Sequence, residues 1–442
     1  MSSILKNSSI TFTSNVFTFV LGLGASIIIS RVLGPTNKGI YVLIALMPAF
    51  LLKLGTLGME VSNVYFSGNR KYTISSIGSN SLFSGFSLGL VLILVFWTIS
   101  KTEMYQNFVR SNNLNAAYIW LLMLMVPFSL ISMFLNSILV GREKVIQFNG
   151  LCLLGIVLQV TFLIIFLILL GLGVFGVILV LVVTCLINVA LMVVFVNKIE
   201  KLKLSFNSRL LADSLKYGAK AYFGNLAQFL NYRLDIFLVA YFLTTADVGY
   251  YALAVGIAER LWMLPNSIAT ILFPRVSSIK IKDANNLTPK VSRHTLSILS
   301  ITALGLLFLS RPVINSLYGS AYLPSVKPFM LLLPGIVALG VGKILSADLA
   351  GRGRPEFGML GAFVSLSVNI PLNIWLIPKW GIAGAAFAST VAYSLATLIA
   401  LIVFLKISGN SLLDTLIIKK QDIETLILPK LQKLKNALGQ VF

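Results

Sequence analysis

The sequence of 442 residues contains few charged side chains, since Asp, Glu, Lys and Arg together make up 11% of it. A soluble domain usually has about 25%. Hydrophobic residues make up 57%, which is more apolar surface than so few charges could keep in solution. The composition therefore excludes an ordinary soluble globular protein. It favours an integral membrane protein, whose outer surface is solvated by lipid.

Cysteine and histidine are also scarce. Cys152 and Cys185 lie inside apolar runs, which predicts small apolar packing residues without disulfide or metal spacing. His294 is the only histidine, so zinc sites built on several histidines are excluded and a Ser–His–Asp triad is disfavoured. We expect no catalytic residues, no metal site and no cofactor, hence a protein that is not an enzyme.

Acidic residues are outnumbered, with 14 Asp and Glu against 35 Lys and Arg, a net charge of +21. Such an excess can indicate nucleic-acid binding, but here the basic residues fall in short segments between long apolar runs. Basic loops of that kind are typical of the cytoplasmic side of membrane proteins. We therefore expect membrane lipid as the partner of this charge and no nucleic acid.

Twelve apolar segments are long enough to cross a bilayer as helices. They are residues 10–33, 40–66, 77–100, 117–140, 147–171, 174–197, 215–242, 249–272, 294–316, 327–350, 357–377 and 381–405. With a cytoplasmic N-terminus, 23 basic residues fall inside and 7 outside. The positive-inside rule therefore predicts a multi-pass protein of about twelve transmembrane helices with both termini cytoplasmic.

The second half of the chain repeats the first. GPTNKGIYVL (34–43) resembles TTADVGYYAL (244–253), and VGREKVIQF (140–148) resembles AGRGRPEFG (350–358), both at an offset of 210 residues. GVFGVILVLVV (173–183) resembles GIAGAAFASTV (381–391) at an offset of 208. Because each half has an even number of helices, both enter the membrane from the same side, which predicts a parallel repeat.

The repeat predicts an all-α fold of two six-helix bundles with a cleft between them. The predicted parts are an N-terminal bundle at 1–197, a linker at 198–214, a C-terminal bundle at 215–406 and a tail at 407–442. The tail mixes leucine and lysine and is too polar to cross the membrane. Two interpretations remain open for it: an amphipathic helix on the cytoplasmic face, broken near Pro429, or a disordered tail.

Nine ionisable residues fall inside the predicted spans. At roughly 3 kcal/mol each in the middle of a bilayer, they could not all face lipid. They are therefore expected to line a wet cavity, to pair or to reach the interface. The basic ones are candidate contacts for an anionic substrate, namely Lys53, Arg233, Arg260, Lys343 and Lys220. The acidic ones are candidates for ion coupling or structural pairing, namely Glu60, Asp235, Glu259 and Asp348.

Three segments resemble a known family. SRVLGPTNKGIYVL (30–43), RLDIFLVAYFLTTADVGYYALAVGIAERLWMLPNSIATILFPRVS (233–277) and PKWGIAGAAFASTVAY (378–393) are similar to the corresponding turns of polysaccharide exporters. The resemblance extends over residues 5–405. It is to the polysaccharide biosynthesis, or O-antigen flippase, branch of the multidrug/oligosaccharidyl-lipid/polysaccharide exporter superfamily.

The resemblance implies a flippase of the bacterial cytoplasmic (inner) membrane that moves an undecaprenyl-pyrophosphate-linked oligosaccharide, such as a lipopolysaccharide O-antigen unit, from the inner to the outer leaflet. It also implies polysaccharide polymerases as partner proteins. No Walker-type phosphate-binding sequence is present. Two alternatives remain: a cation-coupled multidrug exporter of the same superfamily, and a membrane-embedded polymerase or glycosyltransferase, which the scarcity of acids in the outer loops disfavours.

Overall fold

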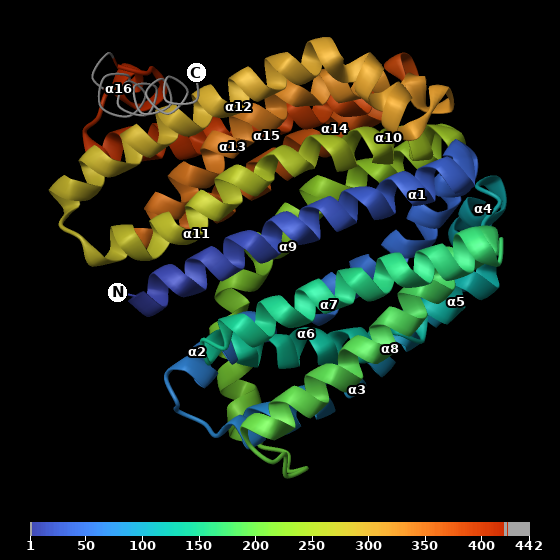
Figure 1. The fold of residues 1–442 in the computed structure, drawn as a ribbon, viewed down its shortest axis with the longest axis horizontal. Helices are drawn as coiled ribbons and strands as arrows, with labels where there is room; N and C mark the ends of the chain where they lie inside the picture. The colour runs from blue at the N-terminus through green and yellow to red at the C-terminus, as the bar shows by residue number, and fades with distance from the viewer. Residues whose placement is uncertain (1, 420–421, 423–442) are drawn as a thin grey trace, which may run out of the picture. The chain divides into compact units, whose positions relative to one another are not determined.

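The computed structural model describes residues 2–419 and Asp422, except for the side chains of residues 2–12, Val145 and Lys220. These residues form helices and no β-strand (Figure 1). The α-helices are α1 (Ser2–Gly55), α2 (Met59–Gly68), α3 (Ile74–Ser100), α4 (Glu103–Ser111), α5 (Ala116–Met123), α6 (Val126–Gly141), α7 (Val145–Leu163), α8 (Gly173–Ile199), α9 (Ser208–Phe242), α10 (Thr245–Ala258), α11 (Met263–Ser278), α12 (Ile281–Tyr318), α13 (Val326–Gly351), α14 (Glu356–Trp380), α15 (Ile382–Ser408) and α16 (Leu412–Leu416). A π-helical segment, η1 (Ile164–Leu169), and two 3-10 segments, η2 (Glu259–Trp262) and η3 (Ser320–Ser325), complete the set.

Nine helical segments of the described chain are long and apolar enough to cross a membrane. One of them contains two predicted crossings, because Gly34 (φ 70°, ψ 174°) interrupts the helical backbone of α1. The other two predicted crossings are α9 and the α10–α11 segment, which are more polar. The chain is thus an all-α integral membrane protein with about twelve crossings, as the sequence predicts.

The helical segment around Gly39 in α1 packs against its repeat partner around Gly249 in α10. A Cβ atom on Gly39 would collide with the carbonyl oxygen of Thr245, and one on Gly249 would collide with the carbonyl oxygen of Pro35. Pro35 and Thr245 are themselves 210 residues apart. The two contacts are therefore reciprocal, which is the relation that a twofold axis between repeats produces. Both glycines are needed for this close approach.

The turns that follow α6 and α13 also match. Gly141 and Gly351 end these helices, and two residues later Glu143 (φ 55°) and Gly353 (φ 79°) both adopt the left-handed backbone. A positive φ is uncommon for a residue other than glycine, so the shared conformation does not follow from residue type. It confirms that these turns are equivalent positions of the repeat.

The chain forms two compact units by its internal contacts. The first contains residues 1–252, 313–325 and 380–382, and the second contains residues 253–312, 326–379 and 383–442. In the first unit α6 packs against both α3 and α8 (Figure 1). In the second unit α11 packs against α13. The domain boundaries expected from the repeat differ from this grouping and stay a prediction.

The predicted linker, residues 198–214, is bound to α3 within the first unit. The side chain of Asn80 donates to the backbone oxygen of Asn207 (2.7 Å) and accepts from its backbone N–H (2.8 Å). Lys71, in the turn before α3, forms an ion pair with Asp213 (2.6 Å). These contacts lie at one end of the helices, which agrees with the predicted placement of both segments on one membrane face.

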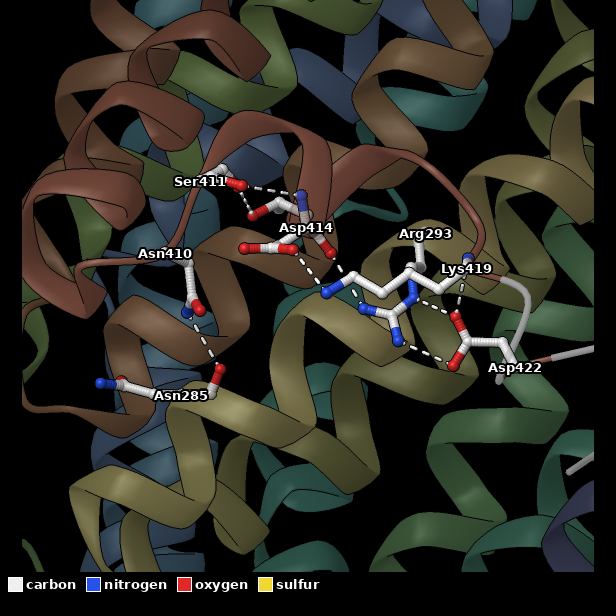
Figure 2. A network of polar contacts seen from close by, with 8 residues as sticks. Asn285, Arg293, Asn410, Ser411, Asp414, Lys419 and Asp422 are labelled. Carbon is white, nitrogen blue, oxygen red and sulfur yellow. Dashed lines mark hydrogen bonds and ion pairs between the residues drawn. The ribbon is translucent and has the colours of Figure 1, made fainter.

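The described part of the C-terminal tail is tied to α12 (Figure 2). The guanidinium group of Arg293 donates to both carboxylate oxygens of Asp422 (2.5 and 2.7 Å) and to the backbone oxygen of Asp414 (2.9 Å). Asn410 donates to the backbone oxygen of Asn285 (2.9 Å). The tail up to residue 419, with Asp422, is therefore held as a strap on α12. Pro429, where a helix break was predicted, lies outside the described residues.

Candidate functional site

Lys53 and Glu60 form a loose ion pair across a break in the backbone. Their Nζ and Oε1 atoms are 3.9 Å apart, and their side chains are 25% and 31% exposed. We expected one continuous helix to carry both residues, which is wrong. α1 ends at Gly55 and α2 begins at Met59, because the residues between them include positive φ angles. The break, and not helical periodicity, brings the two charges together.

Glu60 uses only part of its hydrogen-bonding capacity. Its Oε1 atom is buried and accepts no hydrogen bond from the described residues. At 3.9 Å the Lys53 ammonium is beyond normal hydrogen-bond distance, so the attraction between them is purely electrostatic. The two residues are therefore not joined by a direct hydrogen bond.

α9 carries three of the predicted site residues, and they differ in environment. Asp235 is buried and accepts a hydrogen bond from the hydroxyl group of Tyr251 (2.6 Å). Arg233 is half-buried and donates to the backbone oxygen of Tyr232 (2.9 Å). The side chain of Lys220 lies outside the described part. Geometry therefore favours structural pairing for Asp235, one of the two roles predicted for it.

The second unit holds a cluster around Trp262, the last residue of η2. The indole N–H of Trp262 donates to the backbone oxygen of Ile336 (3.0 Å), which fixes the ring. The ammonium group of Lys343 lies 4.7 Å from the centre of this ring, within cation–π distance, and is attracted electrostatically by Glu259. Arg260 follows Glu259 and is half-buried. The structure thus brings two predicted site residues, Lys343 and Glu259, together beside the Trp262 ring.

Asp348 is fully satisfied by its neighbours. Its carboxylate accepts from the hydroxyl group of Thr288 (2.5 Å) and pairs with Arg352 (2.5 Å), and it is completely buried. The guanidinium group of Arg352 also lies 5.8 Å from the centre of the Phe404 ring. Every oxygen of Asp348 has a partner, so this residue serves helix packing.

Lys38, one of the seven basic residues counted on the outside, is buried. It is 6% exposed, and its ammonium group donates to the hydroxyl oxygen of Ser30 (2.7 Å). The rings of Tyr318 and Tyr322 lie 5.7 and 5.2 Å from it. No sequence pattern around Lys38 predicts this burial.

No group of three or more His, Cys, Asp or Glu side chains suited to a metal ion occurs within residues 13–419. The chemistry of the site therefore rests on lysine, arginine, carboxylate and aromatic groups. Such groups can bind an anion through charge and hydrogen bonds, and they can stack on a sugar ring.

Residues 28–327 match the profile of the polysaccharide biosynthesis protein family. The chain belongs to this family. Among curated relatives it is 27% identical to the probable flippase AglR of Haloferax volcanii over 215 residues, which is 46% of this chain and 44% of that protein. It is 23% identical to the putative O-antigen transporter of Shigella flexneri over 415 residues, which is 90% of this chain and 96% of that protein. The match thus spans about two fifths of the archaeal relatives and nearly all of the Shigella protein.

Solved structures share the fold. The chain is similar to the inward closed conformation of the lipid II flippase MurJ, with a TM-score of 0.74 and 22% identity over 92% of this chain and 91% of that one. It is also similar to an inward-facing multidrug resistance MATE family transporter, with a TM-score of 0.71 and 14% identity over 91% of this chain and 98% of that one. These likenesses show that the chain shares the fold of these two proteins.

Proposed function

We propose that this protein is a flippase that transfers a lipid-linked oligosaccharide between the leaflets of the membrane. The substrate that the site suits is a sugar unit on a polyprenyl pyrophosphate, such as the undecaprenyl-linked repeat of an O-antigen, carried from the inner to the outer leaflet. A pyrophosphate needs cationic hydrogen-bond donors, and the sugars need polar or aromatic surface. The family membership and the flippase among the relatives support this function.

The observation that carries the proposal is the concentration of half-buried basic side chains on the most polar crossing segments. Arg233 and Arg260 belong to α9 and to the α10–α11 segment, the two segments too polar to pass as apolar spans. Lys53 is 25% exposed and only loosely paired. In lipid, such charges would be too costly, so they belong in a wet cavity that accepts an anion.

The transport mechanism proposed here is alternating access. The reciprocal contact between the Gly39 and Gly249 segments is the relation that a twofold axis between repeats would produce, and two such halves would rock about the substrate. The headgroup would cross beside the basic residues while the polyprenyl chain stays in lipid. Energy would come from an ion gradient, the membrane potential or consumption of the product outside.

The proposal places the protein in the bacterial cytoplasmic membrane with both termini inside. The strap residues on α12 and the bonded segment 198–214 would then lie on the cytoplasmic face, where the basic loops accumulate. Polysaccharide polymerases acting on the delivered unit are the expected partner proteins.

A multidrug exporter is the second candidate, supported by the TM-score of 0.71 to a multidrug resistance transporter. An exporter of cationic drugs would use an acid whose oxygens are not all engaged in hydrogen bonds. Glu60, with an unbonded buried oxygen, is the residue in the candidate site that fits this role.

The deciding experiment is complementation of a deletion strain at matched protein levels, with surface polysaccharide and the lipid-linked intermediate as readouts. Wild type should restore the polymer, whereas Lys53→Gln and Arg260→Gln should leave it reduced at least tenfold and cause the intermediate to accumulate inside. Lys144→Gln is the matched control because Lys144 is an exposed loop cation. A deletion strain with normal polymer but new sensitivity to cationic drugs would replace the flippase with the exporter.

A further inference from the structure

Two tyrosine rings stack on each other where α2 packs against α9 in the first unit. The ring centres of Tyr65 and Tyr217 are 4.2 Å apart, and the ring planes are inclined by 13°. A Cβ atom on Gly58 would collide with the backbone of Gly218, and one on Gly218 would collide with the backbone of Gly58. The backbones of α2 and α9 therefore approach as closely as they can, and this approach brings the two rings together.

The stacked pair is exposed, although it lies on a buried base. Tyr65 is 44% exposed and Tyr217 is 39% exposed. The ring of Phe66 contacts both of them, with centre distances of 5.2 and 5.9 Å, and Phe66 is only 4% exposed. The buried ring supports the two tyrosines from below, so they present a firm aromatic surface.

A charged hydrogen-bond acceptor lies beside this surface. Asp213 precedes Tyr217 by one helical turn on α9, so the two side chains share a face of the helix. Its Oδ2 atom accepts from the ammonium group of Lys71 (2.6 Å) and from the hydroxyl group of Tyr72 (2.7 Å), and these bonds lower the pKa of the Asp213 carboxyl. An ionised carboxylate has about four acceptor positions, so capacity remains for further donors. Because two donors hold Oδ2, the carboxylate keeps an anchor when one of them is lost.

The surroundings of the rings suit a sugar better than a lipid tail. Asn69 follows Tyr65 by one turn and is exposed, and Lys216 beside Tyr217 is exposed as well. An acyl chain on the rings would remove these groups and the Asp213 carboxylate from water without replacing their hydrogen bonds, which is unfavourable. A sugar ring instead has an apolar C–H face that can pack on an aromatic ring and hydroxyl groups at its edge that can donate to a carboxylate.

We propose that Tyr65, Tyr217 and Asp213, the tyrosine platform, bind a sugar ring of the lipid-linked oligosaccharide. The C–H face of the sugar packs on the stacked tyrosines, and hydroxyl groups at its edge donate to Asp213. This inference rests on the proposed function and assigns sugar recognition to residues other than the basic contacts for the pyrophosphate. In the orientation proposed above, this end of α2 and α9 faces the cytoplasm, so the platform binds the sugar before transfer.

The test compares two lipids on the full chain in lipid nanodiscs. The probes are the lipid-linked oligosaccharide extracted from the deletion strain and undecaprenyl pyrophosphate without a sugar. Each displaces a fluorescent short-chain polyprenyl pyrophosphate, and the ratio of the two Kd values measures sugar recognition. The wild type should bind the glycosylated lipid at least tenfold more tightly than the lipid without a sugar.

Variants of the platform should change this ratio specifically. Tyr65→Ala and Tyr217→Ala should each reduce the preference at least fivefold, and Asp213→Ala should reduce it a few-fold. Tyr65→Trp keeps an aromatic face and should retain most of the preference, which separates loss of the ring from misfolding. Tyr241→Ala removes a 65% exposed tyrosine from the other end of α9 and, as the matched control, should leave the preference unchanged. Lys53→Gln should weaken binding of both lipids equally.

The outcomes separate the platform from the proposed function. Equal binding of both lipids by the wild type, or a wild-type preference in both tyrosine-to-alanine variants, overturns the platform and leaves the flippase proposal intact. A lower Tm with an unchanged preference in these variants also overturns it, and identifies the rings as interface anchors. A wild type that binds neither lipid overturns the proposed function and the platform with it.

Discussion

Asp348 and Glu60 are both acidic residues within predicted spans, and each lies beside a basic residue. They differ in how completely their carboxylate oxygens are hydrogen-bonded. Asp348 is fully buried and bonded to both Thr288 and Arg352 at 2.5 Å. Glu60 faces Lys53 at 3.9 Å, with both side chains partly exposed and one oxygen unbonded. A satisfied intramembrane charge stabilises the fold, whereas a loosely paired one remains able to bind. We expect the degree of hydrogen bonding and pairing, rather than depth in a span, to separate structural charges from substrate contacts.

A second contrast separates two buried cations, Arg293 and Lys38. The guanidinium group of Arg293 donates to Asp422 and to the backbone oxygen of Asp414 (Figure 2). Lys38 is as deeply buried, but its ammonium group donates to the hydroxyl oxygen of Ser30 and lies beside the rings of Tyr318 and Tyr322. The first cation closes an ion pair, and the second contacts a hydroxyl group and aromatic rings.

The largest loss of stability is expected where the satisfied pair is broken. Asp348→Asn leaves the buried guanidinium of Arg352 without its counter-charge, which should cost about 3–5 kcal/mol. Chemical denaturation of the purified protein, or the corresponding drop in Tm, measures this loss. Arg352→Met should cost a similar amount. A loss below about 1 kcal/mol for both variants would show that the pair is not structural.

Removing the loose pair should affect transport and not folding. Lys53→Gln should reduce transport of the lipid-linked substrate at least tenfold, since it removes a charge offered to the pyrophosphate. Its stability should change by less than about 1 kcal/mol, because the pair is distant and partly exposed. Flux into the outer leaflet of proteoliposomes, measured beside denaturation, separates the two effects. Full transport by this variant would contradict the assignment.

The strap should detach when its carboxylate is neutralised. Arg293 holds the pKa of Asp422 below its ordinary value of 3.8, at about 2, by hydrogen bonding to the charged form. The stability that the Asp422–Arg293 pair gives to the strap is therefore fully present above about pH 4 and is lost as the pH falls towards 2. Asp422→Asn should reproduce this loss at pH 7 as faster tryptic cleavage after Lys419.

Pepsin cleavage of the wild type near the strap should stay slow at pH 4 and accelerate at pH 2. The Asp422→Asn variant should be cleaved at the same rate at both values after correction for pepsin activity. Equal protection of variant and wild type at pH 7 would show that the ion pair does not hold the strap.

The smallest effect is expected at the exposed pair of Lys71 and Asp213. Although their atoms are 2.6 Å apart, the Lys71 side chain is 53% exposed and water replaces the contact readily. Lys71→Ala should leave Tm and transport within experimental error of the wild type. A clear drop in either would mean that attachment of the segment 198–214 contributes more than its exposure indicates.

Much of the fold follows from the sequence because hydrophobic length and turn glycines are local properties. The composition, the twelve apolar segments and the offset of 210 residues predicted the helices and the repeat. The helical segments around Gly39 and Gly249 confirmed the repeat by packing on each other. The break between α1 and α2 was missed, because Lys53 to Glu60 contains no proline and only two glycines that apolar spans tolerate.

The sequence by itself determined that the protein lies in the membrane, that it is built from two repeats and which ionisable residues fall within the spans. Only the tertiary structure decided which of those charges have hydrogen-bond partners. Thr288 donates to Asp348 and Tyr251 donates to Asp235, and neither partner could be recognised from the sequence around the acid. It also decided that Lys38 is buried. Burial and pairing depend on which side chains meet after folding, and that information is not local in the chain.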